Sequence, residues 1–432
     1  MKFFITTLGC HFSQYDTWRV KTILGSLHHT ETANATDADL VILNTCAVQE
    51  RSEHQALEML QEICNLIKDE TRVGIIGCMI PETSTVLPVK APQNIRSILQ
   101  PDFVISARDF SKLEKILPRL FPHASVMNET ENEAVPTPLY TSIPVSQGCS
   151  EFCTYCIVPY RRGPQHFIEP EKVVSEVGTF AENGTKVVTL LGQNLLRYGH
   201  NLNKLVESIS AIPGIKRIYL SSFHPRYFTK AAAGLFDLKK VCPYVRIPVQ
   251  SGCNDILRRM GRNYTVEEFV SIVQTLRHRF PGIAISTDFI VGFPGESESQ
   301  FEESVILAQK LSLDGARVAT YSPRPGTAAL RKYDDNIALE IKNRRKAIID
   351  SIIEKSVLQN NRELIGKTVQ ILCETATPRE SIGRTGTAKK VSIENTCLNP
   401  GGFYRACITR ASPWCLYGRI IYMLPYRELY PP

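Results

Sequence analysis

The 432-residue sequence predicts an α/β protein with three folded parts, and the pattern of apolar residues indicates each part. Short apolar runs alternate with helical patterns over the first hundred residues, and again six times in the middle of the chain. Because parallel strands need helical crossovers, each region is predicted to hold a parallel sheet. The last 69 residues instead carry β-rich runs separated by Gly, Pro and Asn, which is typical of a small β-barrel.

Residues 1–116 are predicted to form the first of these parts, a parallel α/β domain. Its expected strands lie at residues 2–8, 40–43, 73–76 and 103–105. Residues 53–68 carry apolar side chains at helical spacing and predict a helix between the second and third strands. Residues 117–142 are rich in Pro, Asn, Glu and Thr, so we interpret them as a linker to the next domain.

The middle of the chain, residues 143–335, is predicted to be a partial (βα)6 barrel of the TIM type. Its six expected strands lie at residues 143–147, 186–191, 217–221, 245–249, 284–291 and 316–321. In such a barrel the chemistry takes place at the carboxyl ends of the strands. Residues 336–363 are predicted to form a charged helical connector. The β-barrel is predicted at 364–432, with β-rich runs at 368–373, 386–391, 404–408 and 418–423.

Composition excludes several classes of protein. Hydrophobic residues make up 43% of the chain, which argues against disorder, and no apolar run reaches the ~18 residues of a membrane span. The apolar start is too short for a signal peptide, so we expect a cytoplasmic protein, without a membrane partner and monomeric. Thirteen cysteines are many for a reducing compartment, and metal binding or catalysis explains them better than disulfides.

The positive charge is concentrated near the carboxyl terminus. The chain carries a net charge of +7, and +5 of it falls in the last 69 residues. Basic residues there, such as Lys389, Lys390, Arg405 and Arg410, are interleaved with aromatic ones. Such a module suits a polyanionic partner, nucleic acid first, although charge alone is equally compatible with a solvated surface.

The strongest motif is a CxxxCxxC spacing formed by Cys149, Cys153 and Cys156, directly after the first barrel strand. Three thiolates at this spacing can surround a [4Fe–4S] cluster and leave one of its four irons without a protein ligand. A chelating cosubstrate can bind to that iron. A zinc site is the alternative, but zinc takes four ligands and no fourth is evident here.

A second set of cysteines is spread along the first domain. Cys10, Cys46 and Cys78 each follow a predicted strand, and the carboxyl ends of parallel strands converge on one edge of a sheet. The three can therefore share a metal site. Three separate buried residues explain them equally well, since free cysteine is among the most buried residue types.

Taken with their neighbours, these cysteines resemble those of the radical S-adenosylmethionine superfamily and, within it, of the methylthiotransferase family. The resembling motifs are Leu8-Gly9-Cys10, Asn44-Thr45-Cys46, Gly77-Cys78 and Gln147-Gly148-Cys149. Further along, similar motifs occur at residues 190–194, 249–252, 286–296 and 321–327. The resemblance covers nearly the whole chain, and the terminal barrel is similar to the TRAM module, an RNA-binding fold.

The resemblance implies two [4Fe–4S] clusters and S-adenosylmethionine as cofactors. It gives the second cluster to Cys10, Cys46 and Cys78, where an open iron presents the sulfur to be transferred. The implied reaction adds a methylthio group to isopentenyl-adenosine beside the anticodon of tRNA, with the anticodon stem-loop as partner. An external electron donor and a sulfur donor are also implied, and no side chain is assigned as a catalytic acid, base or nucleophile.

Other substrates and another class of protein stay open at this point. Within the family, the substrate is alternatively threonylcarbamoyl-adenosine of tRNA or an aspartate of a ribosomal protein. From a different class, a non-catalytic iron–sulfur redox sensor that binds RNA also fits. Formation of deoxyadenosine from S-adenosylmethionine on reduction distinguishes an enzyme from such a sensor.

Several further residues are candidates for the site. Gly192, Gln193 and Asn194 follow a barrel strand and line the cosubstrate pocket, or else form an ordinary strand-to-helix turn. Asp288 falls in an apolar strand, where a carboxylate needs a partner. The Arg161-Arg162 pair meets an anion or solvent. Ser13 departs from the family, which usually has Asn three residues after the first cysteine.

Overall fold

The computed structural model describes residues 1–47, 50–81, 101–122 and 139–424. These residues divide into two compact units. Of the described residues, the first unit contains those up to 122 together with 146–166 and 324–327, and the second contains 139–145, 167–323 and 328–424. Both units contain the parallel strands that the sequence predicts.

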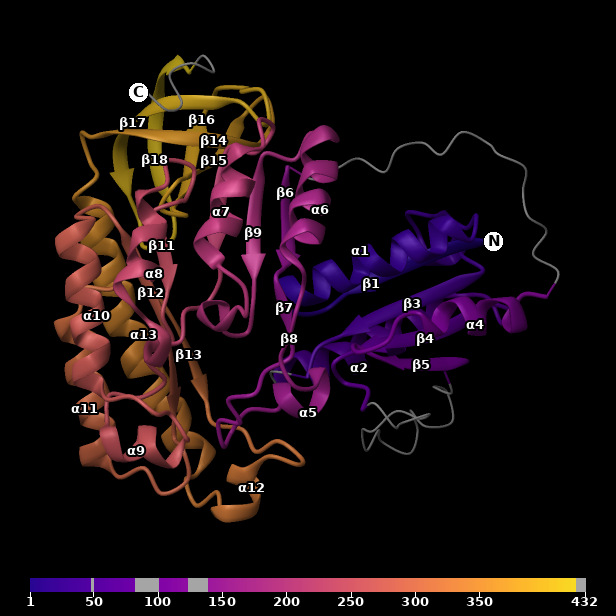
Figure 1. Cartoon of the computed structure of the whole chain (residues 1–432), viewed down its shortest axis with the longest axis horizontal. Helices are drawn as coiled ribbons and strands as arrows, with labels where there is room; N and C mark the ends of the chain where they lie inside the picture. The colour runs from indigo at the N-terminus through magenta and orange to yellow at the C-terminus, as the bar shows by residue number, and fades with distance from the viewer. Residues whose placement is uncertain (48–49, 82–100, 123–138, 425–432) are drawn as a thin grey trace. The chain divides into compact units, whose positions relative to one another are not determined.

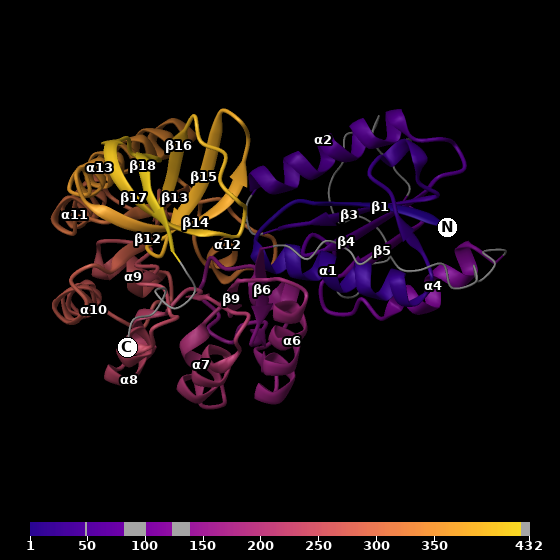
Figure 2. The same ribbon diagram turned by 90° about the horizontal axis from the view of Figure 1, so that it is seen from above.

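The first unit is built on a five-stranded parallel sheet with the order β2-β1-β3-β4-β5. Its strands are β1 (Lys2–Thr7), β2 (Thr30–Glu31), β3 (Leu40–Thr45), β4 (Arg72–Gly77) and β5 (Phe103–Ser106). Helices α1 (His11–Ser26) and α4 (Lys112–Leu120) cover one face, and α2 (Glu50–Leu66) covers the other (Figures 1 and 2). The chain order reverses between β1 and β3, so this is a doubly wound sheet with a switch point between them.

The core of this sheet follows from its sequence. Strand β3 is buried along its whole length, as expected for a strand covered on both faces. Leu24 of α1, Leu60 of α2 and Leu113 of α4 pack into the same apolar cluster. Helix α1 was not predicted, because polar residues interrupt its buried face: Ser13 and Asp16 are both fully buried.

The second unit contains the partial barrel, as the parallel strands of two three-stranded sheets. One sheet has the order β10-β9-β6 and the other β11-β12-β13. The two sheets meet between β10 and β11, where the Ile218 N–H of β10 donates to the oxygen of Lys240, ahead of β11, and the Phe223 N–H, past β10, donates to the Arg246 oxygen of β11. The strands are β6 (Tyr140–Pro144), β9 (Val187–Leu191), β10 (Arg217–Leu220), β11 (Tyr244–Arg246), β12 (Ala284–Val291) and β13 (Gly315–Thr320).

Helices lie along the outside of these strands (Figure 2). The principal ones are α6 (Pro170–Glu182), α7 (Leu202–Ala211), α10 (Val266–Arg279), α11 (Glu298–Lys310) and α13 (Leu339–Arg362). Shorter helices are α8 (Lys230–Gly234), α9 (Asn254–Arg259) and α12 (Ala328–Lys332). A capping box of Thr265 and Glu268 begins α10, where the side chain of each residue accepts a backbone N–H of the other.

The carboxyl-terminal strands close into a barrel with the order β14-β15-β16-β18-β17 (Figure 1). They are β14 (Thr368–Ala376), β15 (Glu380–Thr385), β16 (Lys390–Glu394), β17 (Phe403–Ala411) and β18 (Leu416–Met423). The barrel also packs on the central strands, since Leu372 and Phe403 share an apolar cluster with Val187 and Tyr219. Barrel and central strands therefore have a common core.

Four predicted elements need correction. The expected strand 143–147 lies earlier, at Tyr140–Pro144. The expected strand 386–391 is wrong at residues 386–389, which form the turn between β15 and β16, and β15 itself was missed. The expected strand 245–249 is shorter, ending at Arg246. The linker predicted at 117–142 begins too early, since its first residues, including Pro118, belong to α4. Residues 123–138 of this linker lie outside the described residues.

Candidate metal centres

The first cysteine set gathers at the switch point of the sheet in the first unit. Cys10 follows β1, Cys46 follows β3 and Cys78 follows β4. Cys46 and Cys78 are buried, whereas Cys10 is exposed at the start of α1. Ligands of doubly wound sheets bind at this point, outside the carboxyl ends of the strands.

Two glycines allow the three turns to approach one another. Gly9 has φ +135°, and a Cβ built there would lie 2.7 Å from the Cβ of Cys46. Gly77 has φ +105°, and its Cβ would lie 2.4 Å from the carbonyl oxygen of Thr45. Only glycine adopts these conformations without strain at such close contact. The Cys78 N–H donates to the same Thr45 oxygen at 3.0 Å, which fixes the third turn against the second.

Polar atoms without partners surround these thiols. Four buried atoms have no hydrogen-bond partner within the described part of the chain: Ser13 Oγ, Asp16 Oδ1, Asn44 Oδ1 and Arg162 Nη1. Buried polar groups are normally satisfied, so such a concentration indicates a missing group. The other atoms of Asn44 are used, since its Nδ2 donates to the Ser13 carbonyl at 2.8 Å and to Thr17 Oγ1 at 2.9 Å.

A buried ion pair joins this site to the second cysteine loop. Arg162 donates from Nε to the Cys78 sulfur at 3.1 Å and from Nη2 to Asp16 Oδ2 at 2.6 Å. Its guanidinium lies over the Phe12 ring, 5.1 Å from the centroid. The side chains of Arg162 and Asp16 are 5% and 1% exposed, so both charges are removed from water.

The pKa values at this site move in opposite directions for physical reasons. A hydrogen bond from Cys46, with help from the positive charge of Arg162, lowers the pKa of Cys10 to about 5. Burial raises the pKa of Cys78 to about 11, against the pull of Arg162. Burial also raises the pKa of Asp16. The lowered pKa of Cys10 favours its thiolate, and the raised pKa of Cys78 favours its neutral thiol.

The second cysteine set forms one loop in the same unit. Cys149 and Cys153 are buried and Cys156 is half-buried. The loop closes on itself, because the Cys149 N–H donates to the Gly163 oxygen at 3.1 Å and the Cys156 N–H to the Cys153 oxygen at 2.9 Å. It leads directly into the short helix α5 (Val158–Arg162), which carries Arg162 at its end.

Arg108, which follows β5, holds the carboxyl end of α5. Its guanidinium donates to the carbonyl oxygens of Tyr160 at 3.2 Å and of Arg161 at 3.3 Å. The last carbonyl oxygens of a helix have no N–H partner within the helix, so a cationic donor near them is favourable. Arg108 and Arg162 thus connect the Cys149–Cys156 loop to the sheet edge that carries the other three cysteines.

Among the described residues, no three or more His, Cys, Asp or Glu side chains are placed to hold a single metal ion. A [4Fe–4S] cube differs from such an ion because each thiolate binds a different iron, so its three ligands lie further apart. Each set supplies three thiols, one fewer than a closed zinc or cluster site needs. The donor sets and the orphaned polar atoms therefore fit an iron–sulfur cluster better than a zinc ion.

The remaining predicted residues lie in the second unit. Gly192 to Asn194 follow β9, where the Gly192 N–H donates to Ser221 Oγ at 3.0 Å and the Ser221 hydroxyl donates to the Gly192 oxygen at 3.2 Å. Asn194 is buried, and Gln193 Oε1 is buried with no hydrogen-bond partner in the parts of the chain described. Asp288 has the partner its burial requires, since Arg246 Nε donates to it at 3.0 Å.

The sequence analysis did not identify Asp16, and it left open whether the Arg161-Arg162 pair meets an anion or solvent. The signal for Asp16 was available, because it follows Phe12 by four residues and so shares a helical face with an aromatic residue. A carboxylate on an apolar face requires a buried cation. The structure gives the Arg161-Arg162 pair an anionic environment at Arg162, where Asp16 and the Cys78 sulfur lie.

Two family models match this chain. Residues 143–308 match the radical SAM superfamily, and residues 2–98 match a family described as uncharacterized protein family UPF0004. A tRNA-2-methylthio-N(6)-dimethylallyladenosine synthase of Dictyoglomus thermophilum is 36% identical, over 97% of this chain and 98% of its own length. A synthase of the same name from Caldicellulosiruptor saccharolyticus is 33% identical, over 96% of this chain and 92% of its own length.

The chain belongs to the radical S-adenosylmethionine methylthiotransferase family. It is accordingly an enzyme of that family, whose chemistry uses a [4Fe–4S] cluster and S-adenosylmethionine. Among solved structures, the radical S-adenosylmethionine methyltransferase TsrM from Kitasatospora setae has a TM-score of 0.57 at 14% identity, over 76% of this chain and 77% of that one. This likeness supports the fold alone.

Within the described residues, none of the helices combines the length and the apolar character needed to cross a membrane.

Proposed function

We propose that this enzyme transfers a methylthio group to N6-dimethylallyladenosine, the isopentenyl-adenosine beside the anticodon of tRNA. The supporting observation is alignment over more than nine-tenths of the chain with relatives named for that product. The family's other substrates, threonylcarbamoyl-adenosine and a ribosomal-protein aspartate, have no such relative among those named above.

The two cysteine sets have different roles in this proposal. Cys149, Cys153 and Cys156 hold the cluster that binds S-adenosylmethionine, with Gly192, Gln193 and Asn194 lining the cosubstrate pocket. Cys10, Cys46 and Cys78 hold a second [4Fe–4S] cluster. The bound groups supply a radical that activates an inert C–H bond and the sulfur that replaces the hydrogen, with one S-adenosylmethionine used for each of radical formation and sulfur methylation.

The chain's own residues position these groups. Gly9 and Gly77 let the strand ends approach, Arg162 donates to the Cys78 sulfur, and Arg108 holds α5 at the end of the other cysteine loop. Arg162 Nη1, which has no hydrogen-bond partner among the described residues, provides a further donor toward a sulfur or sulfide in the site. The reaction also needs an external electron donor and a sulfur donor.

We assign the β-barrel to tRNA binding. Exposed cations on it include Arg379, Lys390, Arg410 and Arg419, and Trp414 and Tyr422 are exposed aromatic residues. Cations for phosphates beside aromatics for unpaired bases suit loop RNA. Lys389, which the sequence suggested for this role, pairs with Asp314 at 2.9 Å instead.

Mass spectrometry of tRNA nucleosides tests the substrate. A strain lacking this protein should accumulate dimethylallyladenosine and lose its 2-methylthio derivative, and the gene should restore it. Reconstituted enzyme should form the same product from tRNA with S-adenosylmethionine and a reductant. Unchanged nucleosides together with loss of methylthio-aspartate from a ribosomal protein would contradict the proposal, and absence of deoxyadenosine on reduction would indicate a sensor.

A further inference from the structure

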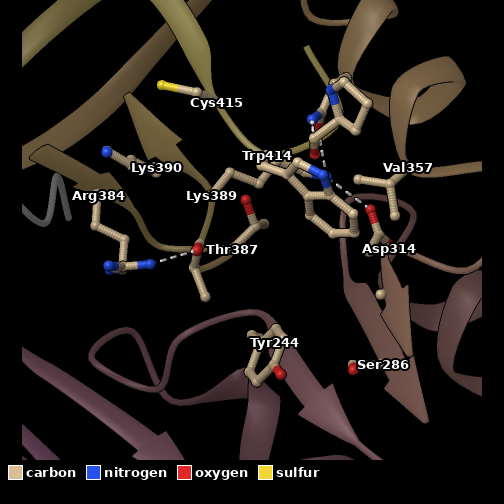
Figure 3. Close-up of a pocket in the computed structure, with 14 residues that line it drawn as sticks. Tyr244, Ser286, Asp314, Val357, Arg384, Thr387, Lys389, Lys390, Trp414 and Cys415 are labelled. Atoms are coloured by element: carbon tan, nitrogen blue, oxygen red, sulfur yellow. Dashed lines mark hydrogen bonds and ion pairs between the residues drawn. The ribbon is translucent and has the colours of Figure 1, made fainter. Parts of the chain in front are cut away.

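A pocket in the second unit lies where the β-barrel meets the central strands. Its volume is about 320 Å³. The lining residues come from the β15–β16 hairpin (Arg384 and Thr387 to Lys390), the β17–β18 turn (Pro413 to Cys415), α13 and the central strands. Figure 3 shows Trp414 on one side of this pocket and Tyr244 on the opposite side. None of the cysteines or cosubstrate-pocket residues assigned above lines this pocket, although Lys390 and Trp414 belong to the barrel surface assigned to tRNA.

The turn that carries Trp414 is fixed. The Ser412 N–H donates to the Cys415 oxygen at 2.8 Å, and the Cys415 N–H donates back to Ser412 Oγ at 3.0 Å. Asn361 of α13 donates from Nδ2 to the Ser412 and Pro413 oxygens at 2.8 and 3.1 Å. The indole is nevertheless 65% exposed. A rigid turn therefore presents a large aromatic face to solvent, an arrangement that lowers the entropy lost on binding a flat ligand.

The β15–β16 turn is also fixed, and Lys390 beside it is available to a ligand. Lys389 donates from Nζ to Asp314 and to Asn361 Oδ1, both at 2.9 Å. Arg384 pairs with Glu374 and donates to the Ala388 oxygen at 3.1 Å. Lys390 is exposed and has no ion pair with an acidic side chain in the described part of the chain. The pocket thus combines one stacking surface with one uncompensated positive charge.

We propose that this pocket binds one unpaired nucleotide of the RNA substrate, its base stacked on Trp414 and its phosphate beside Lys390. The inference rests on the proposed tRNA substrate. A base needs a flat aromatic face and a phosphate needs a cation, and both are held within one cavity here. Ser286 and Thr387 add hydroxyl groups that can meet the edge of a base. An acidic peptide would require several free cations, which this pocket does not offer.

The sequence has two tryptophans, so the proposal can be tested by fluorescence. In a Trp18→Phe variant, Trp414 is the sole indole, and titration with an anticodon stem-loop should quench it because a stacked base lies against the ring. Trp414→Ala should weaken binding about 5- to 150-fold, the ~1–3 kcal/mol of one base stack, and Trp414→Phe should recover most of it. Ile306→Ala is the control, an exposed apolar side chain on α11 outside both the pocket and the β-barrel, and should bind normally.

The proposal would be overturned by saturating RNA that leaves Trp414 fluorescence unchanged, or by full affinity in Trp414→Ala. Quenching by a protein partner but not by RNA would also overturn it. Product analysis of the wild-type enzyme separates this inference from the reaction. Quenching without any methylthio nucleoside would refute the proposed reaction and support nucleotide binding in the pocket. Product formation without quenching would support the reaction and refute nucleotide binding in the pocket.

Discussion

At the scale of single residues, Arg162 has the most specific role. It is buried with Asp16 and donates to the sulfur of Cys78. Replacing it by Met should leave the Asp16 carboxylate buried without a counter-ion and lower the free energy of unfolding by ~3–5 kcal/mol. If Cys78 holds the second cluster, the change should also shift the reduction midpoint of that cluster to a more negative value, because a hydrogen bond to sulfur and a positive charge are lost. Chemical unfolding and a redox titration followed by electron paramagnetic resonance measure the two effects.

A double variant separates the two effects. Arg162→Met with Asp16→Leu replaces the buried pair by apolar side chains and should recover most of the stability, while the shifted midpoint remains. Arg119→Met is the matched control, since Arg119 is exposed on α4 of the same unit. A wild-type midpoint in the double variant would show that Arg162 acts on folding alone.

At the scale of elements, the strand-to-loop turns determine where the cysteines lie. Gly77→Ala would require a side chain at φ +105° and place its Cβ 2.4 Å from the Thr45 oxygen. We expect a loss of at least ~1–3 kcal/mol of stability from backbone strain alone, and a selective loss of the iron bound by Cys10, Cys46 and Cys78. Thermal unfolding and iron analysis measure these changes.

Gly25→Ala is the control, because this glycine lies inside α1 and no atom lies within 4 Å of its added Cβ. It should stabilise the protein by ~0.5–1 kcal/mol and leave the iron content unchanged. Equal behaviour of the two variants would show that the turn after β4 is not needed in its present conformation.

At the scale of the whole molecule, the two cysteine sets should be chemically separable. Replacing Cys10, Cys46 and Cys78 by Ala should retain about half of the iron and the cleavage of S-adenosylmethionine to deoxyadenosine, but abolish the methylthio product. Replacing Cys149, Cys153 and Cys156 should abolish both activities. Full iron content in the first variant, or wild-type cleavage in the second, would refute the assignment of two clusters.

The charge of the β-barrel should appear in the salt dependence of RNA binding. Replacing Arg379, Lys390 and Arg419 by Ser removes three exposed cations. If each contacts a phosphate, the plot of log binding constant against log salt concentration should become shallower by about 2, at ~0.7 per single-strand contact. The control removes three exposed lysines of the first unit, Lys68, Lys112 and Lys115, and should leave the slope unchanged. Deleting the barrel is a poorer test, because it would uncover the apolar cluster shared with Val187 and Tyr219.

The sequence by itself determined the α/β class, the six parallel central strands, the terminal barrel and the family, because strand periodicity and cysteine spacing are local properties of the chain. The sequence did not predict helix α1, whose buried face carries polar residues. It also did not predict the pairing of Arg162 with Asp16, because 146 residues separate the two partners and only folding brings them together. The fixed turns beneath Trp414 likewise depend on Asn361, 51 residues away. Tertiary structure alone decided which polar residues are buried, and burial is what turns a charge or a thiol into a specific site, because outside water each one needs a partner.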